Sequence, residues 1–151
     1  MKNRVALYLS VSLSALLVCS VFCGAQNPSL KLMDVNLAST SGVMVNAICS
    51  SKVMNVRRSD IKVGGGRIYG PVTAFGTTWS INIETSGKQD SIPVTFMTSD
   101  PSQDVLTRTV DGLTAIYGAP TKSSSHDAVW ISESYFIHVR PLSEGGWLIV
   151  F

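Results

Sequence analysis

The chain has 151 residues, of which 45% are hydrophobic and 15% are charged. This length accommodates one domain, and the composition is typical of a globular protein, which excludes a disordered chain. Lys2 and Arg4 account for the formal net charge of +2, because the residues from Gln26 onward carry ten basic and ten acidic side chains. Nucleic-acid binding needs clustered cations, and Arg57-Arg58 is the single close pair from Gln26 onward, so we expect no nucleic-acid partner.

The first 25 residues have the three parts of a cleavable secretion signal. Lys2 and Arg4 form a basic start, residues 5–22 are an apolar stretch, and Cys23-Gly24-Ala25 places small residues where a signal peptidase cuts. We therefore predict a secretion signal over residues 1–25 and one globular, β-rich α+β domain over residues 26–151. The predicted location is exported, in the periplasm or outside the cell.

Two alternatives for this segment stay open. Residues 5–22 are just long enough for a retained membrane anchor, although four serines weaken their apolar character. Cys23 is a candidate for lipidation, but Ser20 and Phe22 are not the aliphatic and small residues that such a signal places before the cysteine. We expect membrane contact through the signal or through a lipid anchor at Cys23, and nowhere else.

Cys49 is the one cysteine left after the predicted cut, so the exported domain has no partner for an internal disulfide. Its neighbours Val45, Ala47 and Ile48 predict a strand, in which Cys49 is a buried structural thiol. The alternative is a nucleophilic thiolate, which needs a histidine partner that the neighbouring sequence does not offer.

The first half of the domain reads as strands. Alternating apolar residues predict strands around residues 33–37 and 43–47, and residues 53–58 are a candidate for a third. The glycines at residues 64–66 break the chain before a strand over residues 67–75, in which a proline indicates an edge position or a bulge.

The next two strands are more regular. Residues 79–83 and residues 92–96 alternate apolar and polar side chains on either side of a turn at residues 86–88. This alternation predicts two half-buried strands.

The spacing of apolar residues predicts one helix over about residues 101–117. Asp100 is a good N-cap and Pro101 suits the first helical position. Gly118 ends the helix, and Pro120 prevents its continuation. One apolar stripe runs along the predicted helix, formed by Leu106, Val110, Leu113 and Tyr117.

Beyond the helix, the sequence predicts strand structure over residues 129–140 and a last strand at residues 147–151 that is apolar on both faces. One face of the first segment is apolar and comprises Val129, Ile131, Tyr135, Ile137 and Val139. Aromatic side chains and arginine anchor protein interfaces. The opposite face is therefore our candidate interaction face, with packing under the helix as the alternative, and it comprises Trp130, Phe136, His138 and Arg140.

Together these elements predict an α+β fold. It consists of an antiparallel β-sheet of about six to eight strands with one packed helix at about residues 101–117. The order along the chain is several strands, then the helix, then a hairpin.

Glycine and metal-ligand patterns do not meet their motifs. The glycines at residues 64–66 and Gly87 lack the spacing and the Lys-Ser/Thr ending of a phosphate-binding loop. His126, His138 and Cys49 include no short-spaced pair of the kind that binds zinc. We therefore assign no cofactor and no metal ligand.

The candidate catalytic patterns are also incomplete. Residues 123–127 collect serine, histidine and aspartate, but a hydrolase triad is assembled from distant segments, so a solvated loop is the better interpretation. Glu84 and Glu133 are the candidate carboxylate pair for glycoside cleavage, with charged residues on a solvated face as the alternative. We assign no catalytic residue.

Residues 99–151 carry a recognisable arrangement. A helix closes on Tyr117-Gly118-Ala119-Pro120, a strand bearing Trp130 follows, and a hairpin ends the segment. This arrangement resembles the second half of BamE-like and β-lactamase-inhibitor-like modules. The resemblance implies a location in the cell envelope and binding to another protein through a sheet face, and it carries no catalytic residues.

The sequence thus predicts an exported, periplasmic or surface-associated domain that is a non-enzymatic protein-binding or envelope structural module, with an envelope protein as partner. One alternative is a small secreted hydrolase with a site assembled from separate strands. Another is a subunit that completes its sheet by pairing with a neighbour. A third is a small outer-membrane-associated β protein, favoured by a terminal pattern of Glu144, Gly146, Ile149 and Phe151.

Overall fold

The computed structural model describes residues 31–37, 40–85 and 92–151. The predicted signal at residues 1–25 and the predicted turn at residues 86–88 lie outside the described residues.

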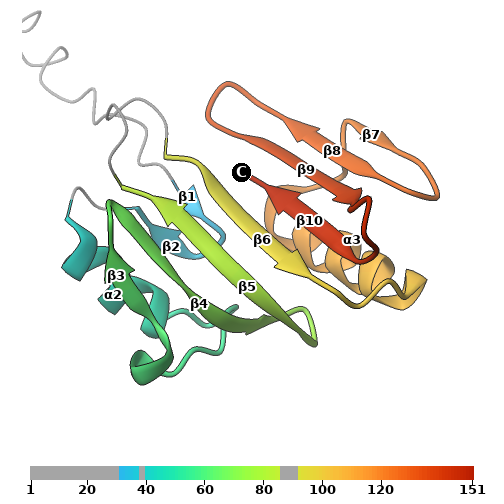
Figure 1. Cartoon of the computed structure of the whole chain (residues 1–151). Helices are drawn as coiled ribbons and strands as arrows, with labels where there is room; N and C mark the ends of the chain where they lie inside the picture. The colour runs from blue at the N-terminus through green and yellow to red at the C-terminus, as the bar shows by residue number, and fades with distance from the viewer. Residues whose placement is uncertain (1–30, 38–39, 86–91) are drawn as a thin grey trace, which may run out of the picture.

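The described residues form an α+β fold in which eight strands make one sheet and two helices pack against it (Figure 1). The strand order is β3-β4-β5-β6-β10-β9-β8-β7, and every neighbouring pair is antiparallel. β3 and β7 form two free edges, so the sheet is open. The predicted fold class is confirmed.

The strands of the sheet are β3 (Lys62–Gly64), β4 (Arg67–Ala74), β5 (Thr77–Glu84), β6 (Val94–Thr98), β7 (Lys122–Ser123), β8 (Ala128–Ile131), β9 (Phe136–Pro141) and β10 (Trp147–Val150). The remaining elements are the helices α2 (Ser41–Cys49) and α3 (Gln103–Tyr117), a single 3₁₀ turn η1 (Arg58–Asp60), and a separate hairpin of β1 (Lys31–Leu32) and β2 (Val35–Asn36).

α2 lies where the sequence predicted a strand, so that prediction is wrong. Met44, Val45 and Ile48 share one side of the helix and are buried, whereas Val43 is 54% exposed. The alternation of valines favours a strand locally, but burial of a helical stripe overrides such weak propensities. Cys49 is therefore a half-buried thiol at the end of a helix.

Two other strand predictions in this region are also wrong. Residues 33–37 are not one strand, because Met33 has a φ of 56° and turns the chain between β1 and β2. Residues 53–58 form no strand, and a single bridge from Asn55 to Thr73 is their link to the sheet.

α3 confirms the predicted helix, beginning two residues later than expected. The residue that caps the helix is Ser102, not Asp100 as predicted, and Pro101 lies before the helix rather than at its first position. Asp100 accepts a hydrogen bond from the Ser102 amide at 2.9 Å, which closes a local turn just before the helix. Gly118 ends the helix with a φ of 82°, in the left-handed region that favours glycine. Leu106 and Leu113 of the predicted stripe are buried.

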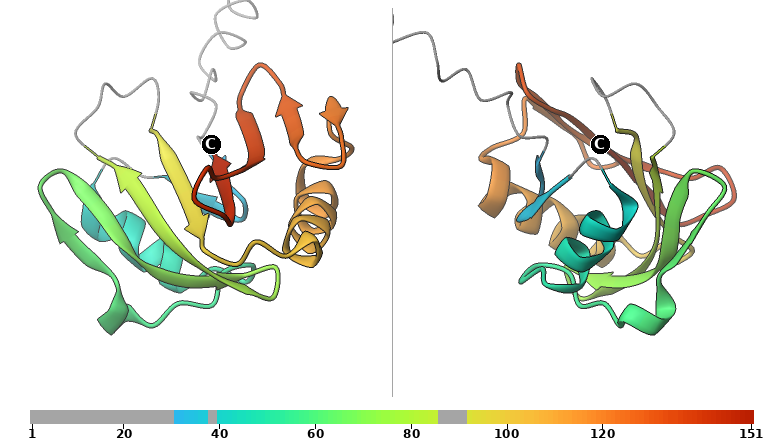
Figure 2. Two further views of the ribbon diagram at one scale, coloured as in Figure 1. Left: turned by 45° about the vertical axis from the view of Figure 1, so that its right-hand side comes forward. Right: turned by 90° about the vertical axis from the view of Figure 1, so that its left-hand side faces the viewer.

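The molecule has two layers. α2, the β1–β2 hairpin and α3 lie on the same side of the sheet, which we call the inner side (Figure 2). Along β5, Trp79, Ile81 and Ile83 point to this side and are buried, and the residues between them are more exposed. Burial of apolar area is the main stabilising term, about 25 cal/mol per Å². No described element covers the other side of the sheet.

Tryptophan side chains fix α3 to the sheet at both ends. The indole N–H of Trp147 on β10 donates to the Ser102 carbonyl at 3.0 Å, next to the start of the helix. The indole N–H of Trp130 on β8 donates to the Gly118 carbonyl at 2.8 Å, at its end. Buried indoles need such acceptors. The Gly118 carbonyl lies at the C-terminal end of the helix, where carbonyl groups lack helical partners, whereas the Ser102 carbonyl also accepts the Val105 amide at 3.1 Å. The crossover helix therefore has a fixed position.

β10 connects the two halves of the sheet, since it pairs with β6 on one side and with β9 on the other. Trp147, Leu148 and Ile149 are 4%, 8% and 0% exposed. These values confirm that this strand is buried on both faces over residues 147–149, although Leu148 points to the side that no helix covers and lies there between its paired neighbours Met97 and Arg140.

Candidate binding surface

The surface of interest is the outer face, defined here as the strand side chains that point away from the helices. Strand pairing assigns them, because directly paired residues lie on the same face. On the half of the sheet around β8–β10 these side chains are Val129, Ile131, Phe136, His138, Arg140, Leu148 and Val150.

Phe136, His138 and Arg140 lie together on the outer face, as predicted, but Trp130 does not. Trp130 is 1% exposed and pairs with Ile137 on the inner face. The prediction continued one alternation through residues 132–135, where the chain turns. Each pair across this hairpin joins an even-numbered residue to an odd-numbered one. The inner side chains are therefore those of the even-numbered residues in β8 and of the odd-numbered residues in β9.

The same turn hid an apolar pair. Ile131 pairs directly with Phe136, and the two side chains are 57% and 49% exposed. The prediction that Ile131 shares the apolar face of Ile137 and Val139 is therefore wrong, because the alternation does not continue through the turn. A turn signal in Ser132-Glu133-Ser134 would have corrected the assignment.

His138 and the loop before β8 do not form a hydrolase site. The Asp127 carboxylate lies 3.7 Å from Nε2 of His138 and accepts a hydrogen bond from the Ser124 hydroxyl. In a triad the histidine stands between the serine and the acid, whereas here the acid stands between them. The His126 ring contacts the neighbouring Ser125 hydroxyl at 2.7 Å. The loop reads as a capped hairpin turn.

Glu84 and Glu133 are not brought together. Glu84 lies on β5 and forms an ion pair with Arg67 at 3.3 Å, and Glu133 lies in the turn between β8 and β9. The strands β6 and β10 lie between β5 and β9, so three to four strand spacings, roughly 14–19 Å, separate the two carboxylates across the sheet. Glycosidase carboxylates stand about 5–10 Å apart, so this pair does not match.

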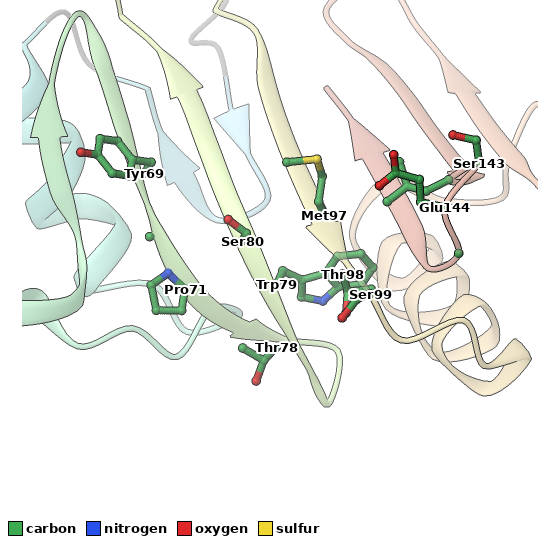
Figure 3. Close-up of a pocket in the computed structure, with 13 residues that line it drawn as sticks. Tyr69, Pro71, Thr78, Trp79, Ser80, Met97, Thr98, Ser99, Ser143 and Glu144 are labelled. Atoms are coloured by element: carbon green, nitrogen blue, oxygen red, sulfur yellow. The ribbon is translucent and has the colours of Figure 1, made fainter.

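A groove of about 810 Å³ crosses the outer face at the other half of the sheet (Figure 3). It lies over β4, β5 and β6, and the turn between β9 and β10 forms its far border. Its lining residues include Tyr69, Pro71, Ser80, Met97, Leu142 and Glu144. The paired row Met97, Leu148 and Arg140 connects the groove to the Phe136 region.

The titratable groups with shifted pKa values serve structural contacts. Partial burial alone would raise the pKa of Asp34, but hydrogen bonds from the Ser51 hydroxyl and the Lys52 amide outweigh it and lower the pKa. Hydrogen bonds from Ser102 lower the pKa of Asp100. Burial raises the pKa of Tyr117, whose hydroxyl accepts the Met33 amide at 2.5 Å.

Within residues 31–37, 40–85 and 92–151, no three His, Cys, Asp or Glu side chains are grouped so as to hold a metal ion. None of the helices in this part of the chain has the length and apolar character needed to cross a membrane.

Comparison with known proteins gave no match to a protein-family model, to a curated protein or to a solved structure. The resemblance of residues 99–151 to BamE-like and β-lactamase-inhibitor-like modules therefore stays a prediction.

Proposed function

We propose that this protein is an exported, non-enzymatic binding module that receives another envelope protein on the outer face of its sheet. One observation carries the proposal: an apolar pair, Ile131 and Phe136, stands exposed on a sheet face that no described element covers. Buried, this pair would contribute about as much as two core side chains, so its exposure fits a surface that a partner covers.

The neighbours of this pair suit an interface. The ring of His138 meets Phe136 edge-on, with ring centroids 6.2 Å apart, and Arg140 is exposed two residues further along β9. An apolar centre with an arginine and a polar rim is the usual composition of a protein interface. The partner class that follows is a protein with a complementary apolar patch.

Export is supported by the basic, apolar and small-residue pattern of residues 1–25. We place the protein in the periplasm or at the cell surface, free or held by a lipid at Cys23. Mass spectrometry of the exported form tests this directly, with Gln26 expected as the first residue. An acylated Cys23 as the first residue would replace this cut with the lipoprotein alternative.

The binding test is affinity capture of envelope proteins on the protein produced from the complete chain. Phe136→Ser should reduce the captured partner at least tenfold, because it removes the centre of the patch. Val63→Ser is the matched control, since Val63 is 51% exposed on edge strand β3, outside the patch. Equal capture by both variants would contradict the proposal.

A further inference from the structure

The first wall of the groove lies against the last residue of η1 and the residue that follows it. Gly70 in β4 lies so close to this segment that an added Cβ would be 3.1 Å from Cδ1 of Ile61 and 3.2 Å from the carbonyl carbon of Asp60. Its φ of 158° is one that a side chain rarely adopts. Tyr69 and Pro71 on either side of Gly70 therefore line the groove from a fixed backbone.

The second wall is the turn between β9 and β10. The Leu142 amide donates to the Gly146 carbonyl at 3.0 Å, and the Gly145 amide donates to the Leu142 carbonyl at 3.1 Å. An added Cβ at Gly146 would lie 2.9 Å from Cα of Ser99, so this turn is seated directly on the end of β6. Both walls are preformed, which lowers the ordering cost of binding.

The floor of the groove is open to solvent. Ser80 and Met97 are directly paired there, and Met97 is 41% exposed. Sites for small molecules bury 70–90% of the ligand surface, which so open a floor does not do. An extended peptide suits such an open groove, because it can bind with one side against the protein and the other side in solvent. Methionine adapts to varied apolar side chains.

Glu144 gives the groove its charge. It is the one charged residue among those that line the groove, and it forms no ion pair with any described residue. In Figure 3 its carboxylate points from the turn toward the Met97 side of the groove. The other side chains of the lining are uncharged, and they include the hydroxyl groups of Thr78, Ser80 and Ser143. This electrostatic asymmetry favours a cation.

We infer that the groove binds an extended peptide segment that places a lysine or arginine side chain at Glu144 and an apolar side chain on Met97. The inference rests on the proposed function, because the segment belongs to the partner that covers the outer face. It adds the chemistry of the segment and a second contact region at the far end of the face from Phe136.

The test uses pools of blocked octapeptides in which one position is fixed as Lys, Arg, Gln or Glu and the others are equimolar mixtures of uncharged residues. Binding to the protein produced from the complete chain is measured by fluorescence anisotropy. At the preferred position, the Lys and Arg pools should bind about three- to fivefold more tightly than the Gln pool, as expected for a solvent-accessible ion pair. The Glu pool should bind most weakly, and added salt should shrink the difference.

Glu144→Gln should remove this preference, and Glu133→Gln should keep it, because Glu133 is likewise an exposed carboxylate in a turn but lies outside the groove. Equal binding of all four pools, or an unchanged preference in Glu144→Gln, overturns the inference. Absence of binding by every pool also overturns it. If Phe136-dependent capture persists in that case, the proposed function stands without the groove. If the protein shows the peptide preference but captures no partner, the groove inference stands and the proposed function does not.

Discussion

Gly112 in α3 faces the ring of Phe75, and this contact gives the sharpest test of how the sheet and the helix are packed. Phe75 occupies the turn between β4 and β5 with a φ of 52°, followed by Gly76 with a φ of 70°. A Cβ added at Gly112 would lie 3.0 Å from Cγ of Phe75 and still closer to two other ring atoms. We predict that Gly112→Ala destabilises the protein, against the usual preference of helices for alanine.

The magnitude follows from two opposing terms. Replacing glycine by alanine inside a helix stabilises it by about 1 kcal/mol. Displacing a half-buried ring whose backbone is fixed by a tight turn costs about 1–3 kcal/mol. The net expectation for Gly112→Ala is a loss of about 1 kcal/mol. In a Phe75→Ala background the ring is absent, so the same change should be stabilising by about 1 kcal/mol. The coupling energy between the two sites is then about 2 kcal/mol.

Urea unfolding of the four proteins measures the cycle, with linear extrapolation of the free energy of unfolding. Ala115→Gly on the same helix calibrates the propensity term, because Ala115 is exposed, and it should cost about 1 kcal/mol. A stabilising effect of Gly112→Ala that is equal in both backgrounds would refute the reasoning. In that case the ring does not press on the helix.

Three further predictions concern stability. Thr109→Val should raise the free energy of unfolding by about 1 kcal/mol, because the buried Thr109 hydroxyl has no hydrogen-bond partner among the described residues; a loss in urea unfolding would mean that it has one in solution. Trp130→Phe should cost about 1–3 kcal/mol by leaving the Gly118 carbonyl unpaired, and an unchanged melting temperature would show that the indole bond is dispensable. Hydrogen bonds hold the folded pKa of Asp34 below 3.8, so its carboxylate contributes stability that is fully present above that pH and is lost as the pH falls through the lower folded value. The stability difference from Asp34→Asn in urea unfolding should therefore be constant near neutrality and shrink in acid, and a difference that does not change with pH would refute this.

α3 could be predicted from the sequence because its signals are local. The spacing of Leu106 and Leu113 and the glycine at position 118 act within one segment of chain, and the structure uses each of them. The predicted cap was two residues early, because Asp100 forms a turn with Ser102 and Ser102 caps the helix. The strands β5, β6 and β10 were predicted for the same reason, since alternation or continuous apolar character within a few residues fixes them.

The errors arose where distant residues decide. α2 is helical because Met44, Val45 and Ile48 bury one stripe against the rest of the fold, a fact absent from the alternation of its valines. Trp130 changed faces because a turn altered the relation between paired positions in β8 and β9. The groove was invisible in the sequence, because four separate segments supply its lining.

The position of β10 also sets the order in which the chain can become a folded molecule. Residues 62–98 and residues 122–141 form the two flanks of the sheet. Each flank has an edge strand, β6 or β9, that stays unpaired on one side until Trp147–Val150 pairs with it. When a chain passes through a translocation pore from its N-terminus, both flanks emerge before the strand that pairs with each of them. For a protein exported as proposed, the two flanks therefore stay unjoined in the sheet until residues 147–150 have emerged.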